Sequence, residues 1–158
     1  MRHVVVRHLA FTPRQLFDLV ADVERYPHFV PWVTAMRTWN RRDIGDGVVT
    51  MDTEARVKFA VIRERFATRD VFDSQALVID VTLLSGPFRH LSNRWRFTPH
   101  PDGAELNFEI DFEFGTRLLH GLLSANLERA VAKLISCFER RASDLYGLGD
   151  AAATPTII

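Results

Sequence analysis

The sequence predicts an α+β domain in which a curved antiparallel sheet lies against a long C-terminal helix. One strand and one helical segment come first, and hydrophobic residues then alternate with a period of two from Val33 to Phe114. From Thr116 to Tyr146 the period becomes that of a helix. Helices grouped on one face of an antiparallel sheet are typical of α+β folds. A chain of 158 residues fits one domain, predicted over residues 1–147 and followed by a flexible tail over residues 148–158.

The N-terminal part predicts a strand followed by a capped helix. The strand covers His3–Leu9. Thr12 is placed to cap the next helix, Gln15 to reciprocate three residues later, and Pro13 suits the first helical position. We expect this helix to end near Asp22 and to bury a stripe made of Leu16, Leu19, Val20 and Val23.

A constrained aromatic segment, YPHFVPW from Tyr26 to Trp32, comes next. Its two prolines are four residues apart and exclude a long regular helix, so the segment forms a loop or a short turn. Such a loop holds bulky apolar groups in place at low entropic cost. Two roles stay open, the mouth of a ligand cavity or a structural lid on the first helix, for Tyr26, Phe29, Val30 and Trp32.

Six strands are predicted between Val33 and Phe114. Turn residues separate them at 45–47, 73–74, 86–87 and 101–103. The strand after Gly47 alternates apolar and charged residues, which predicts one buried and one wet face. Between Val57 and Val71 the alternation becomes unclear, and we expect a turn or bulge near Ala60.

The last hairpin can be given a register. A loop at residues 100–103 pairs Trp95 with Phe108 on the inner face and Arg94 with Glu109 on the outer face. A slip by one residue would expose the aromatic rings to water, so this register is strongly specified. The inner pairs are then Asn93 with Ile110, Phe97 with Leu106 and Leu91 with Phe112.

The inward-facing side chains either fill a solid core or leave a cavity. Twelve Phe and three Trp are more large apolar residues than a domain of this size needs to fold, so a cavity for a lipid-like ligand is the alternative to a solid core. Asn93 is the polar member, and it either donates to a ligand carbonyl or bonds to the backbone. Besides the four aromatic-segment residues, the candidate cavity residues are Met51, Phe59, Leu83, Asn93, Trp95, Phe97, Phe108 and Phe112 from the sheet and Leu119, Leu123 and Leu127 from the helix.

Composition and motifs favour a binding protein. Twenty basic and twenty acidic residues balance, which argues against DNA binding driven by bulk charge. A single cysteine, Cys137, excludes internal disulfides. The six histidines show no close metal-ligand spacing, and neither a G-x-S-x-G elbow nor a glycine-rich phosphate loop is present. We therefore expect no catalytic residues, no metal and no cofactor. With no signal-peptide pattern at the N-terminus, an intracellular location is expected.

Three ordered strings carry a family resemblance: YPHFVPW, then GPFRHLSNRWRF from Gly86, then FEIDFEF before the last helix. Together they resemble the ubiquinone (coenzyme Q)-binding family of the START-like, polyketide cyclase-type helix-grip superfamily, from Val4 to about Leu145. The resemblance implies a seven-stranded sheet around the C-terminal helix and a cavity for ubiquinone or a similar isoprenoid lipid. It also implies a non-enzymatic role in respiratory electron transport, in the cytoplasm with peripheral contact to the inner membrane.

Two other functions stay open within this superfamily. A ribosome-associating toxin or translation regulator would need an RNA-facing arginine patch, and eighteen of the twenty basic residues are arginine. A polyketide cyclase-like enzyme would need inward titratable or polar groups, for which the sequence offers Glu64, His90 and Asn93.

Overall fold

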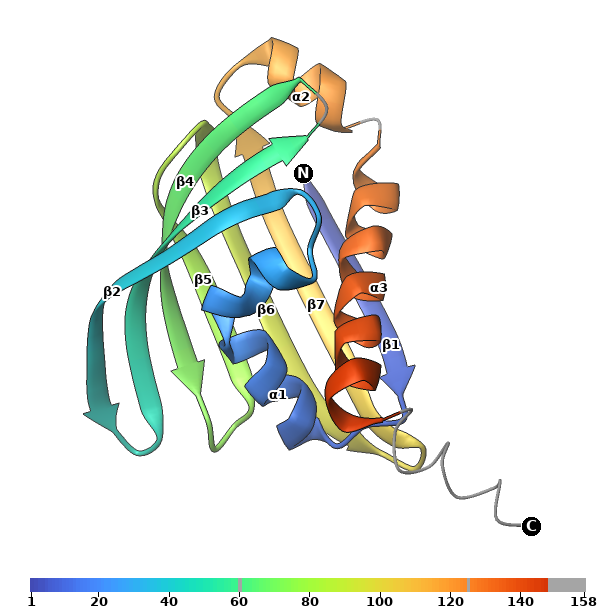
Figure 1. Ribbon diagram of the computed structural model, residues 1–158. Helices are drawn as coiled ribbons and strands as arrows, with labels where there is room; N and C mark the ends of the chain where they lie inside the picture. The colour runs from blue at the N-terminus through green and yellow to red at the C-terminus, as the bar shows by residue number, and fades with distance from the viewer. Residues whose placement is uncertain (60, 125, 148–158) are drawn as a thin grey trace.

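The computed structural model describes the backbone of residues 1–59, 61–124 and 126–147, and it does not describe the side chains of Leu122 and Leu123. The predicted tail over residues 148–158 lies outside the described residues. Figure 1 shows a strongly curved sheet whose concave side faces one long helix, with shorter helical elements beside that helix and over one end of the sheet. The predicted α+β helix-grip architecture is confirmed.

The sheet is antiparallel and seven-stranded, in the order β1-β7-β6-β5-β4-β3-β2. Its strands are β1 (Arg2–Leu9), β2 (Val33–Gly45), β3 (Val48–Phe59), β4 (Ile62–Asp73), β5 (Val78–Ser85), β6 (Phe88–His100) and β7 (Gly103–Phe114). The helical elements are α1 (Pro13–Ala21), the 3₁₀ helix η1 (Val23–His28), α2 (Arg117–Ser124) and α3 (Leu127–Tyr146). Strands β2 to β7 form a meander, in which each strand pairs with the next one along the chain. Strand β1 pairs with β7 at one edge of this meander.

Helix α1 forms as its sequence predicts. The Thr12 hydroxyl accepts a hydrogen bond from the Gln15 amide at 3.1 Å, and the Gln15 side chain accepts one from the Thr12 amide at 3.0 Å. This capping box satisfies two amide groups that would otherwise lack a partner. The buried side chains include the predicted stripe, Leu16, Leu19, Val20 and Val23, together with Phe17.

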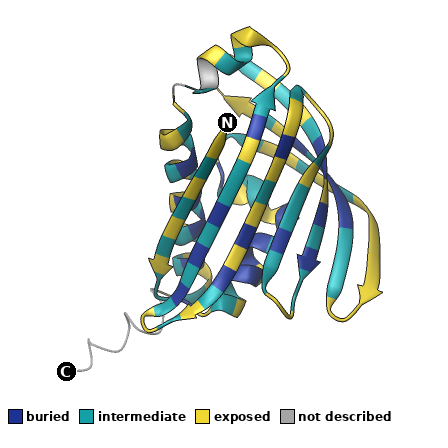
Figure 2. Ribbon diagram, turned by 180° about the vertical axis from the view of Figure 1, so that it is seen from behind, coloured by how far each residue is buried: buried dark blue, intermediate teal, exposed yellow. Residues whose placement is uncertain are grey.

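The β6–β7 hairpin has the predicted register, including Trp95 opposite Phe108 and Phe97 opposite Leu106. Figure 2 shows the alternation of buried and less buried bands along these strands. On the outer face Arg94 lies opposite Glu109, as predicted, while its guanidinium donates hydrogen bonds to Asp80 at 2.6 and 3.2 Å. Asp80 lies opposite Arg94 on the other neighbouring strand, and Glu109 pairs with Arg2 instead.

The ambiguous stretch near Ala60 is a hairpin turn. Strand β3 ends at Phe59 and β4 begins at Ile62, and the two strands stay in register along their whole length. This pairing places Phe66, Thr68, Asp70 and Phe72 on the same face of β4, opposite the inward residues of β3.

The prediction of a single helix from Thr116 to Tyr146 is wrong, because the structure has two helices there. Helix α2 ends at Ser124 and α3 begins at Leu127, and Figure 1 shows α2 turning over the end of the sheet while α3 follows its concave face. A straight continuation would leave the sheet at that end, so the chain changes direction. The buried residues of α3 are Val131, Ile135, Phe138 and Ala142, whereas Leu145 near its end is exposed.

Candidate ligand cavity

A cavity of about 320 Å³ lies between the sheet and helix α3. It is lined by the inner faces of β3 to β7, the start of β2, the segment from Val20 to Val33 and helix α3 as far as Phe138. Its walls are almost entirely apolar or aromatic. This volume is at the lower end of the range for small-molecule pockets, so the cavity accommodates a compact head group and a short apolar stretch.

Seven of the predicted cavity residues line the cavity in the structure. They are Tyr26, Trp32, Asn93, Trp95, Phe108, Phe112 and Leu127. The fold also brings residues that were not predicted to the same wall, among them Met36, Ala55, Phe66, Val81, Phe88, Ile110, Phe114, Leu134 and Phe138.

The other predicted residues lie outside the lining. Val30, Phe97 and Met51 are buried, and Phe97 and Met51 belong to the hydrophobic core cluster. Phe29 packs edge-on against Phe138, with 5.2 Å between ring centroids, and therefore supports the wall from behind. Phe59, Leu83 and Leu119 do not line the cavity, and the Leu123 side chain lies outside the described residues.

A cluster of aromatic rings forms the deep end of the cavity. The Trp95 ring lies 4.3 Å from Phe108 and 5.1 Å from Phe138, centroid to centroid. Tyr26 packs edge-on against Phe138 at 5.2 Å, and its hydroxyl donates a hydrogen bond to the Val20 carbonyl. Burial raises the pKa of Tyr26 well above its ordinary value, and nearby Asp70 adds to the effect. Tyr26 thus stays a neutral phenol that presents its ring to the cavity.

Among the described lining residues, Asn93 is the one with a side-chain amide. Its Oδ1 atom is buried and has no hydrogen-bond partner among the described residues. A buried amide oxygen without a partner is costly, so an unsatisfied group of this kind needs a ligand or a water molecule. Because a side-chain amide carries both a donor and an acceptor, Asn93 can match a carbonyl or a hydroxyl group on a bound molecule.

A buried carboxyl group, Asp70, lies one strand away from this site and was not found from the sequence. Asp70, Val81 and Asn93 occupy one row across β4, β5 and β6. The Asp70 side chain is 3% exposed and accepts hydrogen bonds from the hydroxyls of Thr53 and Thr68, each at 2.7 Å. Burial raises the pKa of Asp70, while the two threonine bonds act in the opposite direction. Both threonines line the cavity, so they separate Asp70 from its interior.

The remaining candidates for enzymatic chemistry lie elsewhere. The His90 side chain is exposed on the outer face, 3.1 Å from the Asp111 carboxylate. Glu64 lies near the β3–β4 turn and is not part of the cavity wall. Of the three residues expected for a cyclase, the structure therefore brings only Asn93 to the cavity. Within the described residues no group of three histidine, cysteine, aspartate or glutamate side chains is arranged to hold a metal ion.

Residues 9–139 match the family described as polyketide cyclase / dehydrase and lipid transport. The chain belongs to this family. Ribosome association toxin RatA of Rickettsia prowazekii is 33% identical over 140 residues, which cover 87% of this chain and 92% of that relative. Mitochondrial coenzyme Q-binding protein COQ10 homolog B of Xenopus laevis is 31% identical over 147 residues, covering 88% of this chain and 57% of that relative.

A solved structure also matches closely. The solution structure of an 18 kDa protein from Caulobacter crescentus is 54% identical, with a TM-score of 0.80, and the match covers 93% of this chain and 99% of that one. The family and the hollow interior together support binding of a lipophilic ligand. None of the described helices has the length and apolar character needed to cross a membrane.

Proposed function

We propose that this protein binds ubiquinone or a similar isoprenoid quinone, without catalysing a reaction on it, and so supports respiratory electron transport. The observation that carries the proposal is an apolar cavity whose wall presents one unpartnered buried amide, Asn93. Ubiquinone combines a polar ring with an apolar tail, which is the chemistry that this wall complements. A relative named as coenzyme Q-binding supports the choice of ligand.

The energetics suit a carrier. Each isoprene unit of five carbons gains about 4 kcal/mol on leaving water, at about 0.8 kcal/mol per carbon. A bilayer offers almost the same gain, so exchange between membrane and cavity is close to balance. Specificity then depends on the ring end, where the Asn93 amide supplies a hydrogen bond. Because the cavity holds about 320 Å³, a long prenyl tail extends through its mouth.

The first experiment asks what the native protein carries. The full chain is purified from a host that makes ubiquinone and is extracted with solvent, and the extract is analysed by mass spectrometry. We expect ubiquinone in clear excess over a control protein purified from the same host. Absence of any isoprenoid quinone from extracts of freshly purified protein would contradict the proposal.

A cavity-filling variant shows whether the ligand occupies this space. Ala55 is buried and lines the cavity, so Ala55→Phe places a ring in the hollow. We expect quinone to be absent from the extract, while the melting temperature stays within a few degrees of the wild type because the new ring enters empty space. A variant that melts normally and still carries quinone would place the ligand elsewhere.

A second candidate function is ribosome association, favoured by the relative that carries that name and by the cations on the outer face of β3 and β4. Arg56 lies opposite Arg65, and Lys58 lies opposite Arg63. Binding to ribosomal RNA would be seen as cosedimentation with the large subunit that weakens steeply as salt is raised. Cosedimentation in the Ala55→Phe variant would show that this activity is independent of the cavity.

A further inference from the structure

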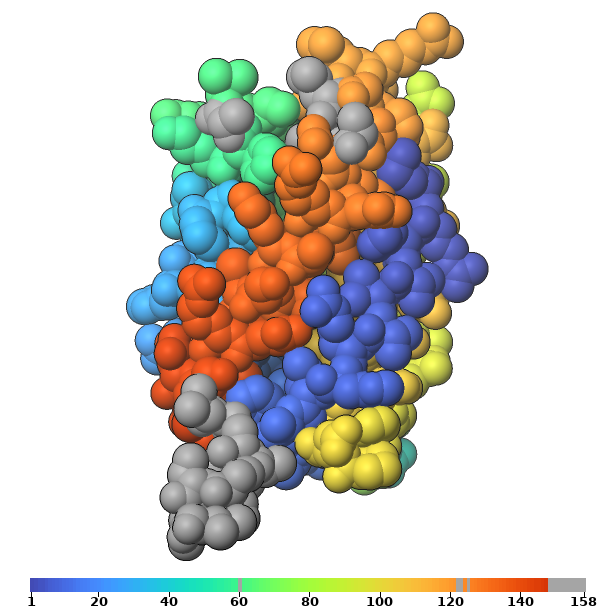
Figure 3. Space-filling model, turned by 90° about the vertical axis from the view of Figure 1, so that its right-hand side faces the viewer, coloured from blue at the N-terminus to red at the C-terminus, as the bar shows by residue number. Residues whose placement is uncertain are grey.

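One end of the molecule carries an unusual concentration of exposed apolar side chains. Val61, at the β3–β4 turn, is 96% exposed, and Leu118, on α2, is 72% exposed. Phe59 at the end of β3 and Leu84 near the end of β5 are also exposed. We call these four residues the apical surface. Figure 1 shows the β3–β4 turn and α2 at the same end, and Figure 3 shows both reaching that end in the space-filling view.

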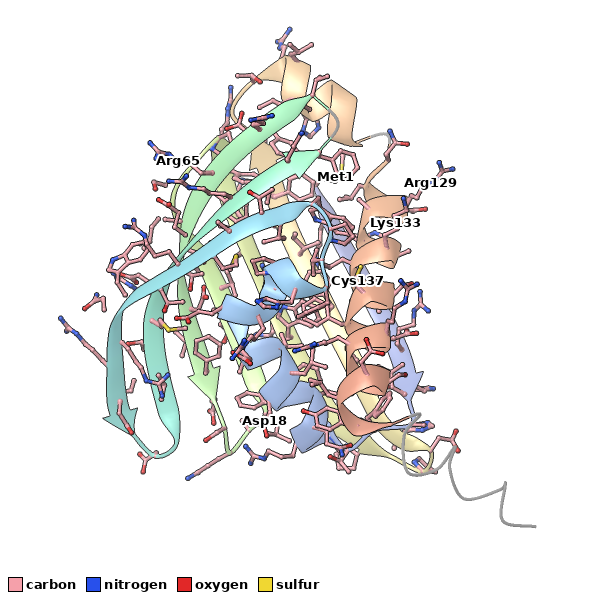
Figure 4. All side chains as sticks on the ribbon, in the orientation of Figure 1. Met1, Asp18, Arg65, Arg129, Lys133 and Cys137 are labelled. Carbon is pink, nitrogen blue, oxygen red and sulfur yellow. The ribbon has the colours of Figure 1, made fainter. Side chains whose placement is uncertain are left out.

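Cations surround the apical surface. Lys58 and Arg63 face each other directly behind the turn, and Arg56 and Arg65 form the next pair. Figure 4 shows Arg65 pointing away from the sheet on its outer side. Like charges on directly opposite residues destabilise a hairpin. No described acidic side chain forms an ion pair with Lys58, Arg63 or Arg65, and these three cations outnumber Glu64, the acidic residue beside them.

The opposite end of the sheet gives a contrast within the same chain. Ile44, at the β2–β3 turn, is 63% exposed and is thus also a projecting apolar residue. Its neighbours are Arg41, Arg42, Asp43 and Asp46, in which the charges balance. An exposed apolar residue alone therefore does not distinguish the apical surface, whereas its combination with uncompensated positive charge does.

We propose that the apical surface docks onto an anionic lipid bilayer, with Val61 and Leu118 inserted and the surrounding cations on the headgroups. Aliphatic side chains gain from entering the acyl boundary, and lysine and arginine gain from negatively charged headgroups. RNA offers phosphates for the cations but nothing for a projecting valine and leucine, so the apolar residues favour a bilayer over RNA. This inference goes beyond the proposed ligand, because it assigns a surface and a partner.

The apical surface lies close to residues that line the cavity, which suits it to ligand exchange with a membrane. Trp32 lines the cavity, and its ring packs edge-on against Phe59 with 6.4 Å between centroids. Val57 and Phe66, next to the same turn, also line the cavity. A protein docked through this end brings these walls close to the bilayer, so a prenyl chain has a short path between the membrane and the cavity.

The test uses the full chain and sedimented vesicles of phosphatidylcholine, with and without phosphatidylglycerol. We expect binding to the anionic vesicles that weakens with salt, and little binding to the neutral ones. Val61→Glu is expected to lower the partition coefficient about tenfold, because it removes an inserted group and adds a repelling charge. Ile44→Glu, the matched control, should bind like the wild type, and unchanged melting temperatures would show that both variants are folded.

Three results would overturn the inference. The first is equal loss of binding in Val61→Glu and Ile44→Glu, and the second is wild-type binding by Val61→Glu. The third is absence of vesicle binding together with ribosome cosedimentation that Arg63→Glu abolishes, which would assign the cations to RNA. The proposed ligand is tested separately, because quinone extraction does not depend on vesicle binding: extracted quinone without vesicle binding removes only the docking surface.

Discussion

The space between the sheet and helix α3 is solid at one end and hollow at the other, although aromatic and aliphatic side chains line both. At the solid end, near α1, the side chains of Phe97, Leu106 and Ile135 are fully buried. At the hollow end, Phe88, Phe112 and Phe114 face the cavity. The boundary follows Trp95 and Phe108, which belong to the core cluster and also to the cavity wall.

The difference follows from which elements cover the sheet. Helix α1 adds Leu16, Phe17 and Leu19 to the core cluster of sheet and α3 residues, and none of these three lines the cavity. Phe17 packs edge-on against Phe97, with 6.4 Å between centroids. At the hollow end, Phe88 packs on the rings of Phe112 and Phe114 along the wall. The number of large apolar residues is therefore no guide to whether an interior is filled.

The largest effect is expected from truncating one ring at each end. Phe97→Ala leaves a cavity in close-packed surroundings and should lower the free energy of unfolding by about 3–5 kcal/mol. Phe88→Ala removes a ring that already borders empty space, stacked on Phe114 at 4.8 Å, and should cost only about 1–2 kcal/mol. Urea unfolding of the two variants measures the difference, and equal losses would mean that the two ends are packed alike.

The strands of the sheet could be predicted from the sequence, because turn residues and alternating apolar residues mark them locally and repeatedly. The register of β6 and β7 follows from one turn and the alternation of rings on a single face. The sequence does not show which residues of β4 face inward near Arg63–Arg65, because charged residues occupy both faces of the strand there. Counting back from Phe72 gives Asp70 and Thr68 as inward residues, so this signal was present but overlooked.

The break between α2 and α3 was harder to predict, because the leucine spacing continues across it. Asn126, which precedes α3, is a residue type that favours helix N-termini, and Glu128 follows in the first turn. These two helix-start signals are weaker than the regular spacing of apolar residues that continues across the break. The shape of the cavity could not be predicted at all, since it depends on how the separate elements cover the curved sheet and not on any single segment.

A smaller effect is expected at Asn93, whose amide belongs to the hollow end. Asn93→Leu removes a buried oxygen without a partner, so the protein without ligand should become more stable by about 1 kcal/mol. The same change removes the hydrogen bond to the quinone ring, and affinity for ubiquinone should fall about tenfold, or about 1.4 kcal/mol. Quenching of tryptophan fluorescence, with Trp95 in the cavity wall, reports the binding. Unchanged affinity would exclude Asn93 as the group that recognises the ring.

The smallest effect concerns Asp70, which is separated from the cavity by Thr53 and Thr68. Because burial raises its pKa in the folded state, the charged form is disfavoured there relative to the unfolded chain. The stability that Asp70 contributes is therefore present below its unfolded value of about 3.9 and is lost as the pH rises through the folded pKa. Relative to Asp70→Asn, the wild type should lose stability between pH 4 and neutrality, as measured by urea unfolding across this range.

Thr53→Val sharpens this test, because the Thr53 hydroxyl stabilises the Asp70 carboxylate. Without that bond the pKa of Asp70 should rise further, and the loss of stability with increasing pH should become larger and extend to higher pH. The same substitution keeps the volume of the side chain, so the cavity wall retains its shape and quinone binding should stay close to that of the wild type. A pH dependence identical in the wild type, Asp70→Asn and Thr53→Val would mean that Asp70 is as well solvated as a surface carboxylate, and the boundary between the solid and hollow ends would then admit water.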